Sequence, residues 1–121
     1  HIEITRDIAE AFNRQYMTNY FPLPEAIINP LATRIMSLRD GTKKMSKSDE
    51  SDFSRLNLTD NADLIAKKIR KAKSDSFSGI TYNVENRPEI SNLINIYCAF
   101  TDSKIESAEQ EFSNLTTAQF K

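Results

Sequence analysis

The apolar residues of the first twenty positions recur at helical spacing. They form a single stripe made of Ile4, Ile8, Ala11, Phe12 and Tyr16. Residues three or four apart lie on one face of a helix, so the spacing predicts a helix over residues 2–20. Pro22 and Pro24 follow it. Because proline cannot continue the helical hydrogen-bond ladder, we expect the helix to end before them.

A short extended segment and a polar loop come next. Residues 32–38 read ATRIMSL and lie between Pro30 and an Asp-Gly pair. A short, partly apolar stretch bounded by turn residues is typical of a strand or an extended segment. Residues 39–51 read RDGTKKMSKSDES. This loop holds many cations beside few apolar anchors, which calls for a chemical explanation.

The second half of the chain is predicted to be helical. One stripe is formed by Ala62, Ile65, Ile69 and Ala72, and another by Ile90, Leu93, Ile94, Tyr97 and Phe100. Thr59 or Asp60 is the expected N-cap of the first of these helices. Gly79 is the expected turn residue behind it, and Pro88 suits the first turn of the next helix. A strand feeding a loop among helices indicates an α/β parent fold, here reduced to its mainly α-helical part with one or two short strands.

Two further helix starts are expected near the end of the chain. Ser103 and Glu106 have the spacing of a capping box, in which each side chain satisfies a free backbone donor of the other residue. A short helix to about Phe112 should follow. Another helix start lies at Thr116 or Thr117, with little sequence after it, and the chain begins at His1 rather than at methionine. We therefore expect this chain to be a piece of a longer protein.

Composition narrows the class of protein. The chain has 121 residues, enough for one domain with a modest core. Its net charge is −1, so affinity for nucleic acid would have to come from local patches. The single cysteine, Cys98, excludes an internal disulfide and is expected to be a small core residue. The sequence has no apolar run of membrane-spanning length, and we expect a cytoplasmic protein with no membrane partner.

The six loop residues from Lys43 to Ser48 carry many hydrogen-bond donors. A lysine is a compact charge with three donors on a flexible stem, and serine hydroxyls add further donors. Such a set can surround a polyphosphate, and Gly41 ahead of it would let the loop open and close. A solvated loop or a nuclear localisation patch explains the same residues. The loop is not a Walker loop, because it lacks the two glycines of that motif.

The sequence of the loop resembles a known family signature. KMSKS, residues 44–48, is the signature of the class I aminoacyl-tRNA synthetases. Three more segments resemble the tryptophanyl-tRNA synthetases, in that family's order: HIEITRDIAEAFN (residues 1–13), RIMSL (34–38) and ISNLINIY (90–97). The tyrosyl enzymes share the architecture but match the first and last of these segments less well.

The resemblance implies an activity and a set of site residues. The family activates L-tryptophan with ATP and Mg²⁺ and transfers it to tRNA(Trp), and its members form homodimers. By analogy, Lys44 and Lys47 would be catalytic and would hold the β- and γ-phosphates. Met45, Ser46 and Ser48 would shape the loop and add contacts, and Ile35 would meet the adenine through its backbone. Residues 1–50 would belong to a Rossmann-like catalytic domain, and residues 51–121 to the start of a truncated helical domain.

The resemblance also has limits. The family often has a proline soon after the signature's aspartate, whereas Glu50 and Ser51 follow here, so we expect a more flexible loop exit. The His-Ile-Gly-His-type motif and a tryptophan pocket are absent from these residues. We therefore expect this chain to hold one half of an ATP site and to be inactive alone. A tyrosyl-type enzyme and a non-catalytic helical RNA-binding module, with affinity that falls steeply with salt, remain the alternatives.

Other charged residues have simpler interpretations. Residues 66–73, AKKIRKAK, place five basic residues opposite the Ile65–Ile69 stripe. Contact with the tRNA backbone is possible there, and a solvated face is the default. Asp49, Glu50 and Asp52 are interpreted as acids that balance the loop lysines rather than as a metal cluster. No cysteine–histidine spacing indicates zinc, and His1 is given no ligand role. The aromatic residues on the stripes are expected to be core residues.

Overall fold

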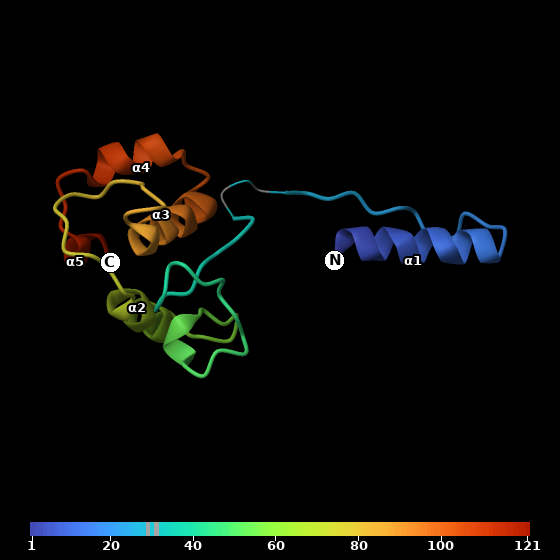
Figure 1. Ribbon diagram of the computed structural model, residues 1–121, viewed down its shortest axis with the longest axis horizontal. Coiled ribbons are helices and arrows are strands. Elements are labelled where there is room, and N and C mark those ends of the chain that lie inside the picture. The colour runs from blue at the N-terminus through green and yellow to red at the C-terminus, as the bar shows by residue number, and fades with distance from the viewer. Residues whose placement is uncertain (29, 31) are drawn as a thin grey trace.

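The computed structural model describes residues 1–28, 30 and 32–121, and these are mainly helical, as predicted (Figure 1). In chain order the helices are α1 (Ile2–Gln15), the 3-10 helix η1 (Asp52–Ser54), α2 (Ala62–Lys71), α3 (Pro88–Thr101), α4 (Ile105–Phe112) and α5 (Thr117–Phe120). Within the described ranges, no helix has the length and apolar character needed to span a membrane. The one or two short strands expected do not form among the described residues: residues 32–34 make a turn and bends, and Met36 forms one isolated antiparallel bridge with Lys44.

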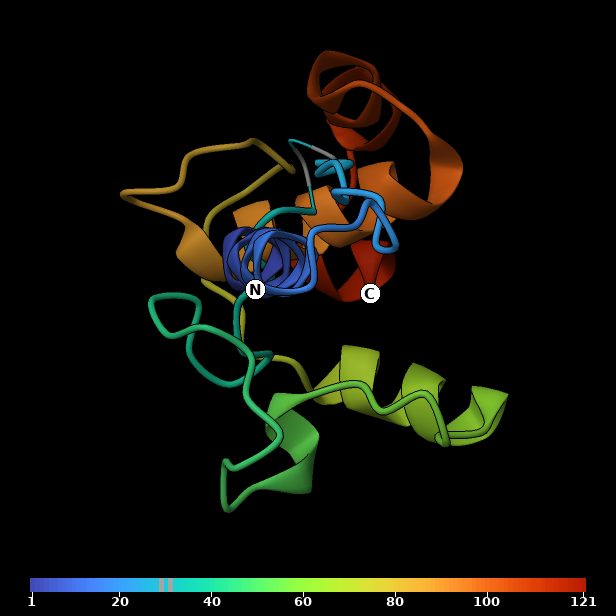
Figure 2. The same cartoon turned by 90° about the vertical axis from the view of Figure 1, so that its right-hand side faces the viewer.

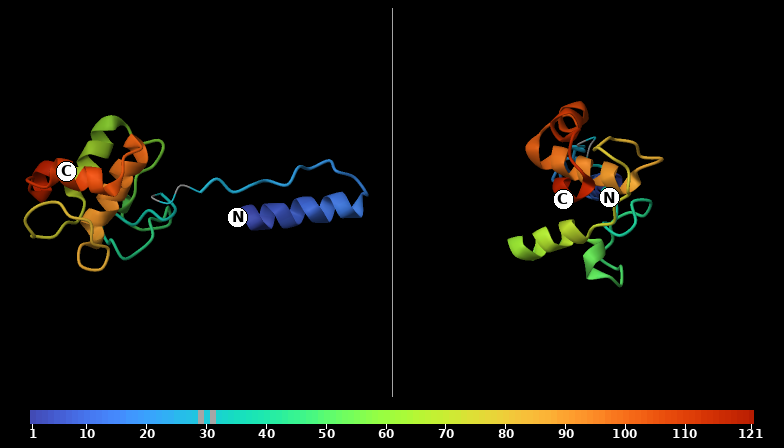
Figure 3. Two further views of the ribbon diagram at one scale, coloured as in Figure 1. Left: turned by 90° about the horizontal axis from the view of Figure 1, so that it is seen from above. Right: turned by 90° about the vertical axis from the view of Figure 1, so that its left-hand side faces the viewer.

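The chain is divided into an arm and a body. Residues 1–28 form the arm, in which α1 lies apart from the other helices at the end of a long extended stretch (Figures 1 and 3). Residues 32–121 form the body, where the remaining helices pack together with the lysine loop, residues 39–51. Figures 1 and 2 both show α3 between α4 and α2 (Figure 2). α3 is therefore the central element of the body.

The arm helix is shorter than predicted. α1 ends at Gln15, and the chain reverses at Met17, which has a positive φ of 49°. The side chain of Asn13 explains the early end. Its amide donates to the Phe21 carbonyl at 2.8 Å and accepts from the Phe21 N–H at 3.1 Å, which folds residues 16–21 back along the helix.

The apolar stripe of α1 is not part of a core among the described residues. Ile4 is 60% exposed, Ile8 64% and Tyr16 61%, and Ala9 is the buried residue of this helix. Phe12 packs against aromatic rings of the arm, with ring centroids 4.6 Å from Tyr16 and 4.8 Å from Phe21. The expectation that the aromatic residues of this stripe are core residues is therefore wrong for Tyr16 in this structure.

α3 supplies most of the core of the body. The buried apolar cluster consists of Leu38, Ala72, Ile80, Ile90, Leu93, Ile94, Cys98 and Ala108. Cys98 is fully buried, as predicted, and burial raises the pKa of its thiol. Phe100 was predicted on the inner face but is 86% exposed. It lies two residues after Cys98, which is about 200° around the helix and therefore on the opposite face.

The start of α2 differs from the prediction by one or two residues. Its N-cap is Asn61, whose side chain accepts from the Leu64 N–H at 2.9 Å, and not Thr59 or Asp60. Asp60 is unavailable as a cap because its carboxylate accepts from the Lys68 ammonium at 2.6 Å and from the Asn57 N–H at 2.9 Å. A partner eight residues along the chain thus overrides the local capping preference.

The later helix starts also depend on competing partners. The predicted capping box of Ser103 and Glu106 is wrong: the N-cap of α4 is Lys104, and the Ser103 hydroxyl accepts from the Thr101 hydroxyl at 2.9 Å. A capping box does occur at the start of α5, between Thr116 and Gln119, where a helix start was expected. Pro88 lies in the first turn of α3, as predicted.

Candidate functional site: the lysine loop

Two backbone hydrogen bonds close the base of the lysine loop, residues 39–51. The Ser37 N–H donates to the Lys43 carbonyl at 2.8 Å, and the Met45 N–H donates to the Ile35 carbonyl at 3.0 Å. These bonds flank the bridge between Met36 and Lys44. The loop therefore leaves and rejoins the body at one fixed place, although the described residues contain no sheet to hold it.

The turn of the loop is pressed against the start of α3. The Asp40 carboxylate accepts from the Thr42 hydroxyl at 2.6 Å and from the Thr42 N–H at 3.1 Å, and these bonds lower the pKa of Asp40. A Cβ on Gly41 would lie 2.6 Å from backbone atoms of Pro88 and Glu89. Gly41 was expected to let the loop move, but in this structure its small size permits close contact with α3.

The loop presents two lysines that have no carboxylate partner. Lys44 and Lys47 are both exposed, and within the described part of the chain neither has an ion-pair partner within 4.0 Å. Lys43 differs, because its ammonium lies 3.5 Å from Asp40. Two cations at the surface, free of carboxylates, can bind an anion without first breaking an internal pair.

The remaining predicted site residues lie around these lysines. Ser46 and Ser48 are exposed, and the Ser48 N–H donates to the Ser46 hydroxyl at 3.2 Å. Met45 is half-buried and packs against the apolar cluster of the body. Ile35 is half-buried at the loop base, where its carbonyl already accepts from Met45. The structure thus brings all six residues predicted from the signature and its preceding segment into one hairpin.

The acids after the signature do not balance the loop lysines, contrary to the prediction. Asp52 lies 2.8 Å from the Lys68 ammonium and 3.2 Å from the Arg55 guanidinium. Asp49 accepts from the Ser51 N–H at 2.8 Å. Across the described residues, no group of three or more histidine, cysteine, aspartate or glutamate side chains is placed to hold a metal ion.

A buried lysine connects the loop exit to α2. The Lys68 side chain is fully buried, and its ammonium contacts Asp52 in η1 and Asp60 at 2.6 Å. Burial lowers the pKa of Lys68, but its hydrogen bonds to the two carboxylates outweigh this effect and raise the pKa overall. The same bonds lower the pKa of each carboxyl group. This network gives the loop exit a firm attachment where the sequence suggested flexibility.

The basic face predicted over residues 66–73 is consequently reduced. Lys68 points inward rather than to solvent, and the Lys73 ammonium pairs with the Glu89 carboxylate at 2.8 Å. Lys67, Arg70 and Lys71 remain exposed. The signal for Lys68 was available, because it lies four residues before the buried Ala72 and so shares its face.

Sequence reasoning also missed Asn92 in α3. Its side-chain amide accepts from the Met36 N–H at 2.8 Å and donates to the Met36 carbonyl at 2.9 Å. Asn92 is only 2% exposed. The signal was a polar side chain inside an apolar run, between Ile90 and Leu93. It reached no prediction because the sequence does not show which backbone the amide meets.

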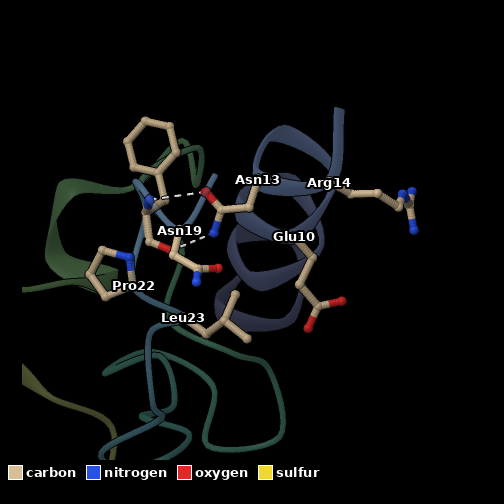
Figure 4. Close-up of a pocket in the computed structure, with 7 residues that line it drawn as sticks. Glu10, Asn13, Arg14, Asn19, Pro22 and Leu23 are labelled. Atoms are coloured by element: carbon tan, nitrogen blue, oxygen red, sulfur yellow. Dashed lines mark hydrogen bonds between the residues drawn. The ribbon is translucent and has the colours of Figure 1, made fainter. Parts of the chain in front are cut away.

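Two hollows lie near the described elements. One, of about 350 Å³, lies beside the loop base and is lined by residues that include Met36, Gly41, Thr42, Asn92 and Asn95. The other, of about 500 Å³, lies at the end of α1, where Figure 4 shows the amide of Asn13 bonded to the backbone of the returning chain (Figure 4). No residue of the lysine loop lines this second hollow. The first hollow therefore borders the lysine loop, whereas the second does not.

Comparisons with known proteins identify a family that matches the whole chain. The family described as tRNA synthetases class I (W and Y) matches residues 1–121. A tryptophan–tRNA ligase of Rickettsia prowazekii is 53% identical over 121 residues, which are the whole of this chain and 37% of that protein. A mitochondrial tryptophan–tRNA ligase of Dictyostelium discoideum is 46% identical over 121 residues, or 32% of its length.

A solved structure is similar as well. The crystal structure of a tryptophanyl-tRNA synthetase from Mycoplasma pneumoniae superposes with a TM-score of 0.64 at 30% sequence identity. The match covers 99% of this chain and 36% of the other. The chain thus spans little more than a third of the length of the relatives to which it is similar.

Proposed function

Because the chain belongs to the class I tRNA synthetases of the tryptophan and tyrosine family, we propose that it supplies the phosphate-binding loop of an enzyme that activates L-tryptophan with ATP and transfers it to tRNA(Trp). The expected fold class is confirmed, since the chain is a mainly helical part of that class I, Rossmann-like architecture. The observation that carries the proposal is the pair of exposed lysines, Lys44 and Lys47, on a loop with a fixed base.

The proposed chemistry needs cations at the leaving group. The tryptophan carboxylate attacks the α-phosphate of ATP, a bond forms between the carboxylate oxygen and that phosphorus, and the bond to the β-phosphate oxygen breaks. Negative charge then collects on the departing pyrophosphate. In the proposal, the ammonium groups of Lys44 and Lys47 stabilise this charge in the transition state. Their flexible stems allow them to follow the phosphates as pyrophosphate leaves.

The other loop residues have supporting roles in the proposal. The Ser46 and Ser48 hydroxyls add donors to the phosphates, and Met45 holds the loop to the body through its apolar packing. Ile35 contacts the adenine through its backbone. The Ile35 carbonyl already accepts a hydrogen bond from the Met45 N–H, which limits its contact with the adenine. Mg²⁺ accompanies the ATP phosphates in this scheme, since it is commonly bound through substrate phosphates.

The proposal extends to the organisation of the protein. Residues 1–50 belong to the catalytic domain and residues 51–121 to a helical domain, and the protein acts as a homodimer. The separation of α1 from the other helices agrees with assigning it to another unit. The reduced basic face on α2 gives little support to the alternative of a non-catalytic RNA-binding module, because Lys68 and Lys73 are both occupied by carboxylates.

Amino-acid-dependent exchange of pyrophosphate into ATP tests the function. The natural protein that carries this chain should catalyse exchange with L-tryptophan and not with L-tyrosine, and it should charge tRNA(Trp). Light scattering of the same sample should give the mass of a dimer. Exchange with tyrosine alone would replace the substrate assignment by the tyrosyl alternative. Absence of exchange together with salt-sensitive RNA binding would overturn the enzymatic proposal in favour of a binding module.

A further inference from the structure

The side chain of Asn92 takes the place of a neighbouring strand. Ile35 and Ser37 pair with the backbone of the loop, on one edge of the chain at Met36. Leu38 bonds the backbone of Ser54 and Lys73 at 2.9 and 2.7 Å. On the other edge, the Asn92 amide bonds both backbone groups of Met36, at 2.8 and 2.9 Å, from 56 positions along the chain. A primary amide has one acceptor and one donor side by side, so it satisfies both groups that a partner strand would otherwise satisfy.

Met36 connects this amide directly to the candidate site. It lies next to Ile35 in the chain and opposite Lys44 in the bridge. One edge of its backbone is held by α3, and the hydrogen bonds that flank it hold the loop. The position of Lys44 relative to α3 is therefore set through a single intervening residue.

A second contact joins the same two elements. Backbone atoms of Pro88 and Glu89, at the start of α3, lie 2.6 Å from the position that a Cβ of Gly41 would occupy. α3 therefore contacts the loop at its base, through Asn92, and at its turn, through Gly41. Two contacts at separate points of the loop resist a tilt that one contact would allow.

We propose that Asn92 is a positioning residue for the lysine loop, which places Lys44 and Ile35 for the nucleotide. The inference rests on the proposed function for its catalytic consequence. Asn92 does not touch the phosphates itself and acts through Met36. A displacement of reacting groups by about 1 Å can lower a rate by about a hundredfold, so a fixed loop base is worth more to the rate than to overall stability.

α3 provides a matched control for this inference. Asn95 follows Asn92 by three residues and lines the same hollow, but its side-chain oxygen is buried without a hydrogen-bond partner in the described structure. Asn92→Leu and Asn95→Leu therefore make the same chemical change on the same helix. Only the first of them breaks the bonds to Met36.

The test uses the natural protein that carries this chain. Asn92→Leu should lower kcat for tryptophan-dependent pyrophosphate exchange by about tenfold or more, with the KM for tryptophan changed by less than about twofold. Asn95→Leu should leave both constants near those of the unsubstituted protein. Gly41→Ala, which displaces the loop turn by a different route, should reproduce the loss in kcat. Equal losses in the Asn92 and Asn95 variants, or an unchanged kcat in a folded Asn92→Leu protein, would overturn the inference.

Hydrogen exchange separates positioning from catalysis. The Met45 N–H, which closes the loop base, should exchange faster in Asn92→Leu than in Asn95→Leu, whether or not the protein is active. If the unsubstituted protein shows no pyrophosphate exchange, the proposed function fails, and the amide measurement still decides the role of Asn92. If Asn92→Leu does not fold, Gly41→Ala carries the kinetic arm, and an unchanged kcat in that variant contradicts the inference.

Discussion

The helices α1 and α3 have the same length, 14 residues, and opposite surroundings. α1 buries one residue, Ala9, whereas α3 buries seven. Ile8 of α1 is 64% exposed, and Ile94 of α3 is fully buried. A helical pattern of apolar residues states which face avoids water, but it does not state what covers that face. The same kind of stripe therefore supports the core in the body and stands uncovered in the arm.

The largest expected effect follows directly from this comparison. In a polypeptide of residues 1–121, Ile94→Ala should lower the free energy of unfolding by about 2–5 kcal/mol, because it leaves a cavity in the core. Ile8→Ala, the same change on the exposed stripe, should alter it by less than about 0.5 kcal/mol. Urea unfolding followed by circular dichroism measures both. Comparable losses would show that the arm stripe is covered, and a dependence on protein concentration would identify self-association as the cause.

Exposed residues of the body differ from those of the arm because some of them have a proposed role in catalysis. Lys47 is exposed to solvent, as Ile8 of the arm is, but it is charged and belongs to the proposed site. Lys47→Ala in the natural protein should slow pyrophosphate exchange by about a hundredfold at saturating ATP, with little change in the KM for tryptophan.

Two more lysine variants complete that measurement. Lys44→Ala should behave like Lys47→Ala, and the two losses should not simply add if both residues bind one phosphate group. Lys67→Ala removes an exposed lysine from α2 and serves as the control, with an unchanged rate expected. An undiminished rate constant in Lys47→Ala would exclude its assigned role.

An acid-sensitive ion pair exists in the body and has no counterpart in the described arm. Asp75 accepts from Arg87 at 2.8 and 2.9 Å, and this contact holds the pKa of Asp75 below its ordinary value of 3.8. A lowered pKa in the folded state means that the pair stabilises the fold above pH 3.8, and that this stabilisation is lost as pH falls through the lower, folded value.

In Asp75→Asn, the free energy of unfolding should therefore decrease less as pH falls. We expect the variant to be less stable at pH 7 by on the order of 1 kcal/mol, with a smaller difference from the unsubstituted chain at pH 2–3. Asp7→Asn, an exposed change in the arm, is the control, and its acid limb should match that of the unsubstituted chain. Unfolding free energies measured across this pH range would show parallel curves if the Asp75–Arg87 pair contributed nothing.

The smallest effect is expected at Met45, the apolar residue of the signature. Met45→Leu keeps volume and apolar character, so the free energy of unfolding should fall by less than about 1 kcal/mol, and pyrophosphate exchange should remain near its original rate. Thermal unfolding and the exchange assay measure the two effects. A loss in rate as large as that for Lys47→Ala would show that Met45 does more than pack against the body.

Local patterns predicted the elements of this fold well where one strong signal dominated. The apolar spacing of Ile90 and Ile94 predicted the inner face of α3, and Pro88 predicted its first turn. The pattern failed where a partner outside the local motif competed for the same group. Asp60 does not cap α2 because Lys68 binds it, and no local rule contains that contact.

In the candidate site, too, some residues were predicted from the sequence and others were not. The resemblance predicted the lysines, serines and Met45 of the loop, and the structure places them together. The supports of the loop were not predictable in detail, because each depends on which surfaces meet in three dimensions. Asn92 meets Met36 across 56 positions, and Lys68 turns inward among neighbours of the same charge. A basic run shows that cations are present, but it does not show which of them faces the core.

The single cysteine, Cys98, can be used to measure how often the body opens. Cys98 is fully buried in the central helix, and burial raises the pKa of its thiol. A thiol reagent in solution can modify it only during intervals when α3 separates from its neighbours, and then only through the deprotonated form. The modification rate at high reagent concentration therefore counts these openings per unit time. In a polypeptide of residues 1–121, where Cys98 is the single cysteine, body variants can be compared in this way without an added probe.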